Sequence, residues 1–415
     1  MAAPDPPPAA GARTPDRVWI VIVACSVIAA MHVWKFPGAM QWIREDLGMS
    51  LVDAGVLLGI VQLASMLLGL SASVFSERLG LRTTLLIGLL LLALGSLAGA
   101  FATHTWQLMA TRIVEGIGFL FVSVVGPPLV RRWVPTSRAS IAMGWLAAFQ
   151  GIAVFLAVTA GVLLLSPPPV MTWHGWWIVM AVLSVVGLVL ARLVVPRDRA
   201  AAVNLRLAVR AIGKTVAALM PWMLTVMFSM YTLQWGAIIG FLPDIVSDSG
   251  IGPLAAGLAT AIVGGLNGVG NVLAGVALQR GASRRSMVVF GMVSMLVLTV
   301  LLFAPEWSAV PGGHWVQLAI AGLFSGTAAT IPATLTRVAV DIAPPGGAPS
   351  AVIGLMTQVF NAANLVGPVV LTALAVAAGG WHLSWLFTAS ASVIGLVLAA
   401  VFLTSARIGA GQPAP

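Results

Sequence analysis

The sequence predicts an all-α polytopic membrane protein whose twelve transmembrane helices form two pseudo-symmetric six-helix bundles. Of the 415 residues, 60% are hydrophobic and 8% are charged, whereas a soluble globular chain carries about 25% charged residues. Twelve apolar runs are each long enough to cross a hydrocarbon core, which takes about 20 residues per helix. A basic segment near the middle of the chain separates six runs from the other six. These observations exclude a soluble protein.

The predicted spans follow one another at short intervals. The first six lie at residues 18–40, 52–76, 83–102, 106–130, 140–165 and 175–195, and the second six at 219–242, 253–278, 286–304, 315–336, 350–378 and 383–404. The chain is accordingly divided into a disordered Pro/Ala-rich tail (1–17), an N-terminal bundle (18–195), a cytoplasmic basic linker (196–218), a C-terminal bundle (219–404) and a C-terminal tail (405–415).

The basic residues are distributed unevenly over the two sides of the predicted bundles. With the N-terminus inside, 18 of the 21 Lys and Arg residues fall in tails and loops of that side. Short cytoplasmic loops carry such an excess of positive charge. We therefore expect a multi-pass protein of the inner (cytoplasmic) membrane with both termini in the cytoplasm. The formal net charge of +9 is assigned to topology, and no nucleic-acid partner is expected.

The two halves contain an internal repeat. A shift of 202 positions places Glu77-Arg78 on Gln279-Arg280 and Arg82 on Arg284, so polar loop positions agree as well as apolar ones. Two six-helix halves related by an axis along the membrane normal are a known plan of secondary transporters. The repeat therefore favours alternating access, in which one bundle rocks against the other.

Two motifs resemble a known family. The loop after the second span reads Ser73-Val74-Phe75-Ser76-Glu77-Arg78-Leu79-Gly80-Leu81-Arg82, and Arg112 is followed by Glu115, Gly116 and Gly118. The first is similar to the signature loop of the major facilitator superfamily, with Ser73 and Glu77 in place of the family's Gly and Asp. The second resembles the family's fourth-helix pattern. Because the fifth span contains no proline, the resemblance implies a cyanate/nitrate-type or organic-anion permease rather than a drug antiporter.

The motif loop is interpreted as a gate. An acid beside arginines at a helix end can pair with the neighbouring bundle in one conformation and release it in another. The residues assigned to this gating loop are Glu77, Arg78, Gly80, Arg82, Arg280 and Arg284. The alternative is that the arginines only follow the positive-inside rule.

Four ionisable residues lie inside predicted spans, where a charge is costly and marks function by default. At ~1.5 Å per residue, His32 lies ~21 Å from the inner start of its helix and Arg112 ~9 Å from the outer start of its own, so both share one level of a ~30 Å core. Since His32, Lys35 and Arg112 outnumber Glu115, we expect them to bind an anionic substrate, with Glu115 or His32 carrying a proton. Two alternatives remain open: Arg112 and Glu115 neutralise each other as an i,i+3 pair, and Lys35 extends to the outer interface.

Neutral polar residues of the second half are assigned to the same substrate site. Each set falls on one helical face. The sets are Tyr231 and Gln234; Asn267 and Asn271; and Gln358, Asn361 and Asn364, with Gln62 and Gln150 as partners from the first half. The alternative is that these groups hydrogen-bond between helices and have no contact with substrate.

Together these residues predict a secondary active transporter that moves a small anionic solute by proton-coupled alternating access. The alternative is proton-driven efflux of an apolar or cationic compound. An enzyme or an ATP-driven pump is not expected, because the sequence has neither a His-Glu-x-x-His motif nor a phosphate-binding loop. The single cysteine, Cys25, allows no intrachain disulfide and no thiol-based metal cluster. We expect no cofactor, no metal, and a monomer in the lipid bilayer.

Overall fold

The computed structural model describes residues 17–198, 205–247, 251–345, 347 and 349–403. The predicted tails fall outside these residues apart from Arg17, so their disorder stays a prediction. Twelve helical segments of the described chain are long and apolar enough to cross a membrane, which confirms the predicted number of spans.

The N-terminal half contains eight helices, seven of which form its six spans. They are α1 (Arg17–Trp34), α2 (Met40–Leu47), α3 (Leu51–Ile60), α4 (Leu63–Leu79), α5 (Leu81–Gly99), α6 (Thr105–Trp133), α7 (Thr136–Leu165) and α8 (Trp173–Val194). α3 and α4 belong to one span that is interrupted at Val61 and Gln62. α2 is a short helix that follows the end of α1.

The C-terminal half repeats this plan after α9 (Leu205–Ala217), which lies in the predicted linker. Its helices are α10 (Leu219–Ser247), α11 (Pro253–Gln279), α12 (Arg284–Phe303), α13 (Gly313–Ala328), α14 (Thr330–Asp341), α15 (Pro349–Ala378) and α16 (Ser384–Phe402), with 3-10 turns at Trp307–Ala309 and Trp381–Leu383. α13 and α14 form one interrupted span.

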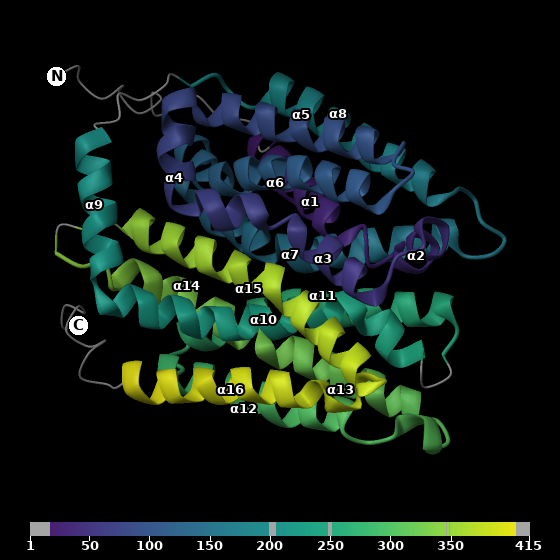
Figure 1. Ribbon diagram of the computed structural model, residues 1–415. Coiled ribbons are helices and arrows are strands. Elements are labelled where there is room, and N and C mark those ends of the chain that lie inside the picture. The colour runs from purple at the N-terminus through teal and green to yellow at the C-terminus, as the bar shows by residue number, and fades with distance from the viewer. Residues whose placement is uncertain (1–16, 199–204, 248–250, 346, 348, 404–415) are drawn as a thin grey trace.

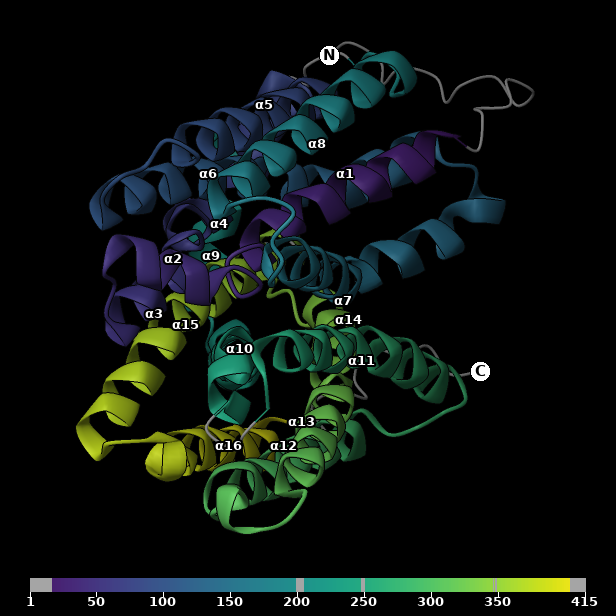
Figure 2. The same cartoon turned by 90° about the vertical axis from the view of Figure 1, so that its right-hand side faces the viewer.

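The two halves lie against each other as stacked layers, α1–α8 on one side and α10–α16 on the other (Figures 1 and 2). α9 lies across one end of the molecule, where α16 also ends, and α2 lies at the opposite end (Figure 1). We call the first the linker end (α9 and Phe402) and the second the far end (α2).

Glycines allow the two halves to approach closely. α7 packs on α11, and α3 and α4 pack on α15. A Cβ added at Gly59 would lie 2.6 Å from the carbonyl oxygen of Leu365, and one added at Gly151 would lie 2.9 Å from the Cα of Gly268. Such backbone approach is the usual role of small residues between membrane helices. The contact between the halves therefore depends on the absence of side chains at these positions.

A substitution at Gly116 in α6 tests the packing inside the N-terminal half. A Cβ added there would lie 2.2 Å from the carbonyl oxygen of Val61, a backbone atom that cannot turn aside. We expect Gly116→Ala to lower the free energy of unfolding by about 1–3 kcal/mol. Gly213 has nothing within 4 Å of an added Cβ, so Gly213→Ala is the matched control. Thermal unfolding in detergent measures both, and equal melting temperatures would contradict the packing argument.

Candidate functional site

Four ionisable side chains meet inside the N-terminal bundle, between α1, α5, α6 and α8. His32 and Lys35 come from the end of α1 and the residue after it, and Arg112 and Glu115 come from α6. All four are 0% exposed. We call them the charge cluster. The structure brings the predicted pair into contact, since Arg112 donates a hydrogen bond to the carbonyl oxygen of His32.

Glu115 is the centre of the charge cluster. Its Oε1 lies 2.5 Å from Lys35 Nζ and 3.4 Å from His32 Nδ1, and its Oε2 lies 2.7 Å from Arg112 Nη1. The i,i+3 pair is thus formed, while Lys35 turns into the bundle instead of extending to the interface. Two fixed cations share one carboxylate, which leaves an excess of one positive charge when His32 is neutral. No group of three His, Cys, Asp or Glu in the described residues is placed to hold a metal ion.

Side chains of α5 and α8 complete the surroundings of the charge cluster. Lys35 Nζ donates to Ser96 Oγ at 2.8 Å and lies 4.3 Å from the ring centre of Trp177. His32 Nε2 lies 2.7 Å from Ser184 Oγ. None of these three partners was predicted from the sequence. Ser96 and Ser184 stand in otherwise apolar spans. Many other serines in apolar spans have no such role, so this pattern does not single out these two.

The charge cluster also closes the end of α1. Pro37 has no backbone N–H, and the residue before a proline avoids helical conformation, so α1 ends at Trp34 with carbonyl groups that lack helical partners. Arg112 donates to two of them, those of His32 and Val33, the second at 3.2 Å. Arg112 therefore connects the Glu115 carboxylate to the end of the helix.

Five aromatic residues meet where the bundles face each other. Trp34 lies edge-on to Trp235 of α10, with ring centres 5.3 Å apart. Tyr231 stacks on Trp235 at 6.2 Å, and Phe228 lies 5.3 Å from Phe360 of α15. We call these five residues the aromatic group. Because Trp34 is the last residue of α1, the aromatic group lies directly beside the charge cluster along the chain.

Asn267 joins several of the predicted polar residues. Its Oδ1 accepts from Tyr231 Oη at 3.3 Å and from Asn271 Nδ2 at 3.1 Å, and its Nδ2 donates to the carbonyl oxygen of Ser325 at 2.9 Å. Trp235 Nε1 donates to Ser325 Oγ at 3.0 Å. Hydrogen bonding between helices, the alternative stated for these amides, is therefore present here.

Two further predicted amides face helices of their own half. Gln234 Oε1 accepts from Ser392 Oγ at 3.1 Å. Asn364 points at α10, since its Oδ1 would lie 2.8 Å from a Cβ added at Gly236. The substrate role assigned to both stays a prediction.

Three buried amide oxygens, those of Gln62, Gln358 and Asn361, have no hydrogen-bond partner among the described residues. They belong to the segments that form the contact of α3 and α4 with α15, where Gln358 packs on Gly69. We call them the unpaired amides. A buried acceptor without a donor costs about 1–3 kcal/mol. A donor that reached these oxygens would therefore remove that cost.

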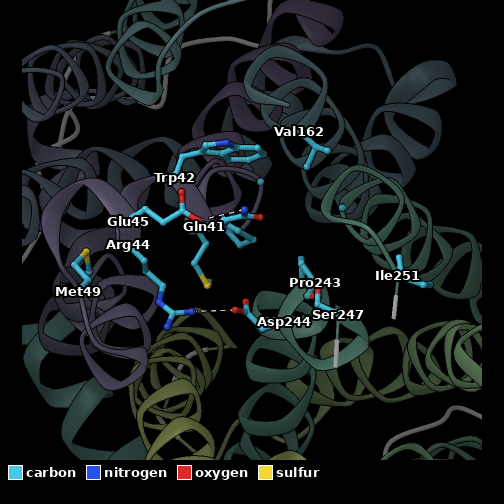
Figure 3. Close-up of a pocket in the computed structure, with 14 residues that line it drawn as sticks. Gln41, Trp42, Arg44, Glu45, Met49, Val162, Pro243, Asp244, Ser247 and Ile251 are labelled. Carbon is cyan, nitrogen blue, oxygen red and sulfur yellow. Dashed lines mark hydrogen bonds and ion pairs between the residues drawn. The ribbon is translucent and has the colours of Figure 1, made fainter. Parts of the chain in front are cut away.

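A cavity of about 480 Å³ lies between the bundles at the far end (Figure 3). Arg44 and Glu45 of α2 line it on one side, and Asp244 and Ser247 of α10 on the other. Arg44 Nη1 lies 3.0 Å from Asp244 Oδ1, so an ion pair joins the two halves. This pair was not predicted from the sequence, because its members are 200 residues apart and no spacing relates them.

The gating loop of the first half lies at the linker end. Gly80 has a φ of +87°, a conformation that favours glycine. The Asp198 carboxylate accepts from the backbone N–H of Leu81 at 2.5 Å and of Arg82 at 3.1 Å. Arg82 also donates to the carbonyl oxygen of Arg192. These contacts hold the turn between α4 and α5 to the end of α8, within the N-terminal half.

Among the side chains that the structure describes, the remaining gating-loop residues form no ion pair between the two halves. Arg284 pairs with Asp341 of its own half at 2.8 Å, and Arg280 is the C-cap of α11. Arg78 is exposed, and the side chain of Glu77 lies outside what the structure describes. The gating role stays a prediction.

Comparison with known proteins assigns the family. The profile of the Major Facilitator Superfamily matches residues 22–233 and again residues 223–415. The chain belongs to the major facilitator superfamily. Membership confirms the predicted fold of two related six-helix halves and makes the protein a transporter and not an enzyme.

Curated relatives of this superfamily member are similar over part of the chain. Putative polyol transporter 1 of Arabidopsis thaliana is 26% identical over 185 residues, which are 45% of this chain and 36% of the relative. The probable L-galactonate transporter of Escherichia coli (strain K12) is 26% identical over 175 residues, 42% of this chain and 38% of the relative. The matches thus cover little more than a third of these relatives.

The number of charges left in the charge cluster predicts which of two variants of this superfamily member is the less stable. Glu115→Gln leaves Lys35 and Arg112 buried without a counter-charge, so we expect a loss of about 3–5 kcal/mol in the free energy of unfolding. Lys35→Met leaves a balanced pair, and we expect a loss of about 1 kcal/mol. Thermal unfolding at neutral pH checks the order. A Lys35→Met variant as unstable as Glu115→Gln would refute the charge count.

Proposed function

We propose that the protein is a proton-coupled secondary transporter that moves a small hydroxylated anion, of the sugar-acid class, by alternating access. The observation that carries this proposal is the buried Glu115 carboxylate shared by two fixed cations and a histidine. Ionisable groups enclosed in a membrane bundle are functional candidates by default. The proposal keeps the anionic substrate and the proton predicted from the sequence and adds hydroxyl groups to the substrate.

Glu115 is the proposed proton carrier. Its Oε1 contacts both Lys35 and His32, so a proton can pass among the three groups without a change of fold. Protonation of Glu115 removes the negative charge that holds Lys35 and Arg112. Since Arg112 closes the end of α1, its release loosens Trp34, which contacts α10 across the bundle boundary. A proton on Glu115 therefore acts on the contact across which the bundles rock.

The excess positive charge of the cluster favours an anionic solute. Because the charge cluster is fully buried, the solute does not touch it. We propose that the solute binds at the aromatic group and that the charge of the cluster acts on it there by long-range electrostatic attraction. At an effective dielectric constant of about 20, a unit charge about 10 Å away contributes roughly 1.7 kcal/mol, or more than tenfold in affinity. An anion gains this energy, a neutral solute gains nothing, and a cation loses it.

The unpaired amides favour a solute with hydroxyl groups. A carboxylate has no hydrogen to donate to an amide oxygen, whereas each hydroxyl has one. The relatives are described as transporters of polyols and of L-galactonate. A polyol offers hydroxyls alone, while galactonate offers hydroxyls and a carboxylate. The second combination suits both the unpaired amides and the positive charge.

We further propose that the linker end faces the cytoplasm, in an inner membrane, with the protein as a monomer. The basic side chains Arg206, Arg210 and Lys214 are exposed along α9, and short cytoplasmic loops carry such charges. In this orientation the gating loop lies on the cytoplasmic side, and the far-end cavity lies on the outside.

Proton-driven efflux of an apolar or cationic compound is the second candidate. The aromatic group favours it, because aromatic faces bind both apolar and cationic solutes. The two candidates differ in the sign of the charge that the solute must carry.

Proton coupling is tested with Lys35→Met/Glu115→Gln, which removes the proton carrier and keeps one excess positive charge, that of Arg112. We expect uptake of labelled L-galactonate driven by a proton gradient in proteoliposomes to fall about tenfold or more, a change of about 1.4 kcal/mol. Exchange of labelled for unlabelled solute needs no net proton movement and should persist. The wild-type protein, which carries the same single excess charge and retains Glu115, is the control. Unchanged gradient-driven uptake by the double variant would rule out Glu115 as the carrier.

The hydroxyl requirement is tested with Asn361→Leu. The variant removes a buried acceptor without a partner and also the hydrogen bond that Nδ2 donates to the carbonyl oxygen of Thr357 in the same helix, so we expect the stability of the free protein to change little. It also removes a bond to the solute worth about 1 kcal/mol, about fivefold in affinity. Ligand-induced shifts of the melting temperature are measured with L-galactonate, galactitol and an organic cation.

We expect L-galactonate to give the largest shift and Asn361→Leu to reduce it. Ser392→Ala is the control, because Ser392 donates to an amide inside the C-terminal half. This variant should lower the melting temperature of the free protein and keep the galactonate shift. A larger shift with the cation than with galactonate would favour the efflux candidate.

A further inference from the structure

The far-end cavity contains a contact between the bundles that the proposed function leaves unexplained. The side chains of Arg44 and Asp244 are 29% and 27% exposed, with 3.0 Å between Nη1 and Oδ1. They reach toward each other from opposite halves (Figure 3). The cavity volume of about 480 Å³ is sufficient for a small organic solute.

Arg44 uses only part of its hydrogen-bonding capacity in this pair. It engages Asp244 through Nη1, while its Nε is buried and has no partner among the described residues. A guanidinium presents a planar fork that binds a carboxylate through two nitrogens at once. A carboxylate that displaces Asp244, and toward which the guanidinium turns, can therefore form a second bond through Nε that Asp244 does not make.

The polar neighbours of Arg44 in the cavity are bonded elsewhere. Glu45 Oε1 accepts from Gln41 Nε2, on the same helix, at 3.3 Å. Ser247 Oγ donates to the carbonyl oxygen of Pro243 at 2.6 Å. The described residues that line the cavity include one cation, Arg44, and two carboxylates, those of Glu45 and Asp244, so Arg44 is the group at which an entering anion can bind.

Both members of the ion pair belong to segments that lead to the aromatic group. α2 follows the break after Trp34, and Asp244 lies nine residues after Trp235 on α10, about 13 Å along the helix. The ion pair therefore joins, at the far end, the same two segments that Trp34 and Trp235 join at the centre. While it is formed, the bundles cannot separate at that end without breaking a charged contact.

We propose that the far-end cavity is a first binding site for a carboxylate. The carboxylate replaces Asp244 as the partner of Arg44, and the loss of the ion pair lets the two halves separate at the far end. The inference rests on the anionic substrate of the proposed function and adds to it a second site with its own trigger. Once Arg44 binds the solute, Asp244 faces a second negative charge across the cavity, and like charges repel. A neutral polyol has no charge with which to displace Asp244.

Val162 provides a reporter of opening. It lines the cavity from α7, is 3% exposed, and packs against Gly257 of α11. The native Cys25 is 1% exposed, so Val162→Cys adds a thiol with little background. The rate of its reaction with a membrane-impermeant maleimide measures how often the far end opens. All further variants are made in this Val162→Cys parent.

The parent should react slowly, and L-galactonate should accelerate it about tenfold, within the usual range of coupling between sites, while galactitol does not. Asp244→Asn and Arg44→Gln should each react fast without solute. The charge exchange Arg44→Asp/Asp244→Arg restores an ion pair and should react slowly again. Glu45→Gln, the matched control, removes a carboxylate of the same cavity without touching the pair and should react as slowly as the parent.

Slow reaction of both single variants, or fast reaction of the charge-exchange variant, would overturn the inference. Equal acceleration by galactitol and L-galactonate would overturn the role of the carboxylate. If one single variant fails to fold, the other and the charge exchange still decide. Failure of the proposed function is seen separately, as transport of polyol in preference to acid, because the variants are compared in the labelling assay without any solute.

Discussion

A single carboxylate between two cations determines the interior of the N-terminal bundle. Glu115 holds Lys35 on one oxygen and Arg112 on the other. Removing charges from water costs several kcal/mol per ion, which is recovered only with close geometry and further hydrogen bonds. The neighbouring residues meet that requirement. Gly95 leaves room for the Glu115 side chain, whose Cγ would lie 2.8 Å from an added Cβ, and Ser96 gives Lys35 a second acceptor. The close packing of α5 on α6 at Gly95 and Ser96 therefore fits the charge that it encloses.

The same constraint extends to the bundle interface through the end of α1. Pro37 interrupts the helix, Arg112 takes the freed carbonyl groups, and Trp34 is held against Trp235. The chain then continues into α2, which carries Arg44 to the far end. Residues 32–47 thus connect the charge cluster, the aromatic group and the ion pair between the halves. A displacement of this one short segment would therefore move residues of all three sites.

The sequence was sufficient to predict the spans and the depth of a residue within them. It was not sufficient to predict the direction in which a side chain points. The spans and the shared level of His32 and Arg112 follow from the rise of a helix and the thickness of a hydrocarbon core. The direction of a side chain is not set by its depth: Lys35 was expected to meet substrate or the interface, and the structure turns it to Glu115. The contact of Arg44 with Asp244 was not predicted, because it depends on how the two halves pack together. The periodicity of residues within one helix contains no information about that packing.

Paired charges and unpaired amides have opposite effects on the conformational balance. The charge cluster is bonded within one half, so it stays intact whether the halves are together or apart. The unpaired amides lie where α3 and α4 meet α15, and at about 1–3 kcal/mol each they oppose a dry closed contact that the glycines otherwise favour. Their sum is comparable to the ~5.5 kcal/mol that moves a two-state equilibrium from one state to the other. In the proposed function, a solute that donates hydrogen bonds to these oxygens would offset this cost and favour closure of the contact around it.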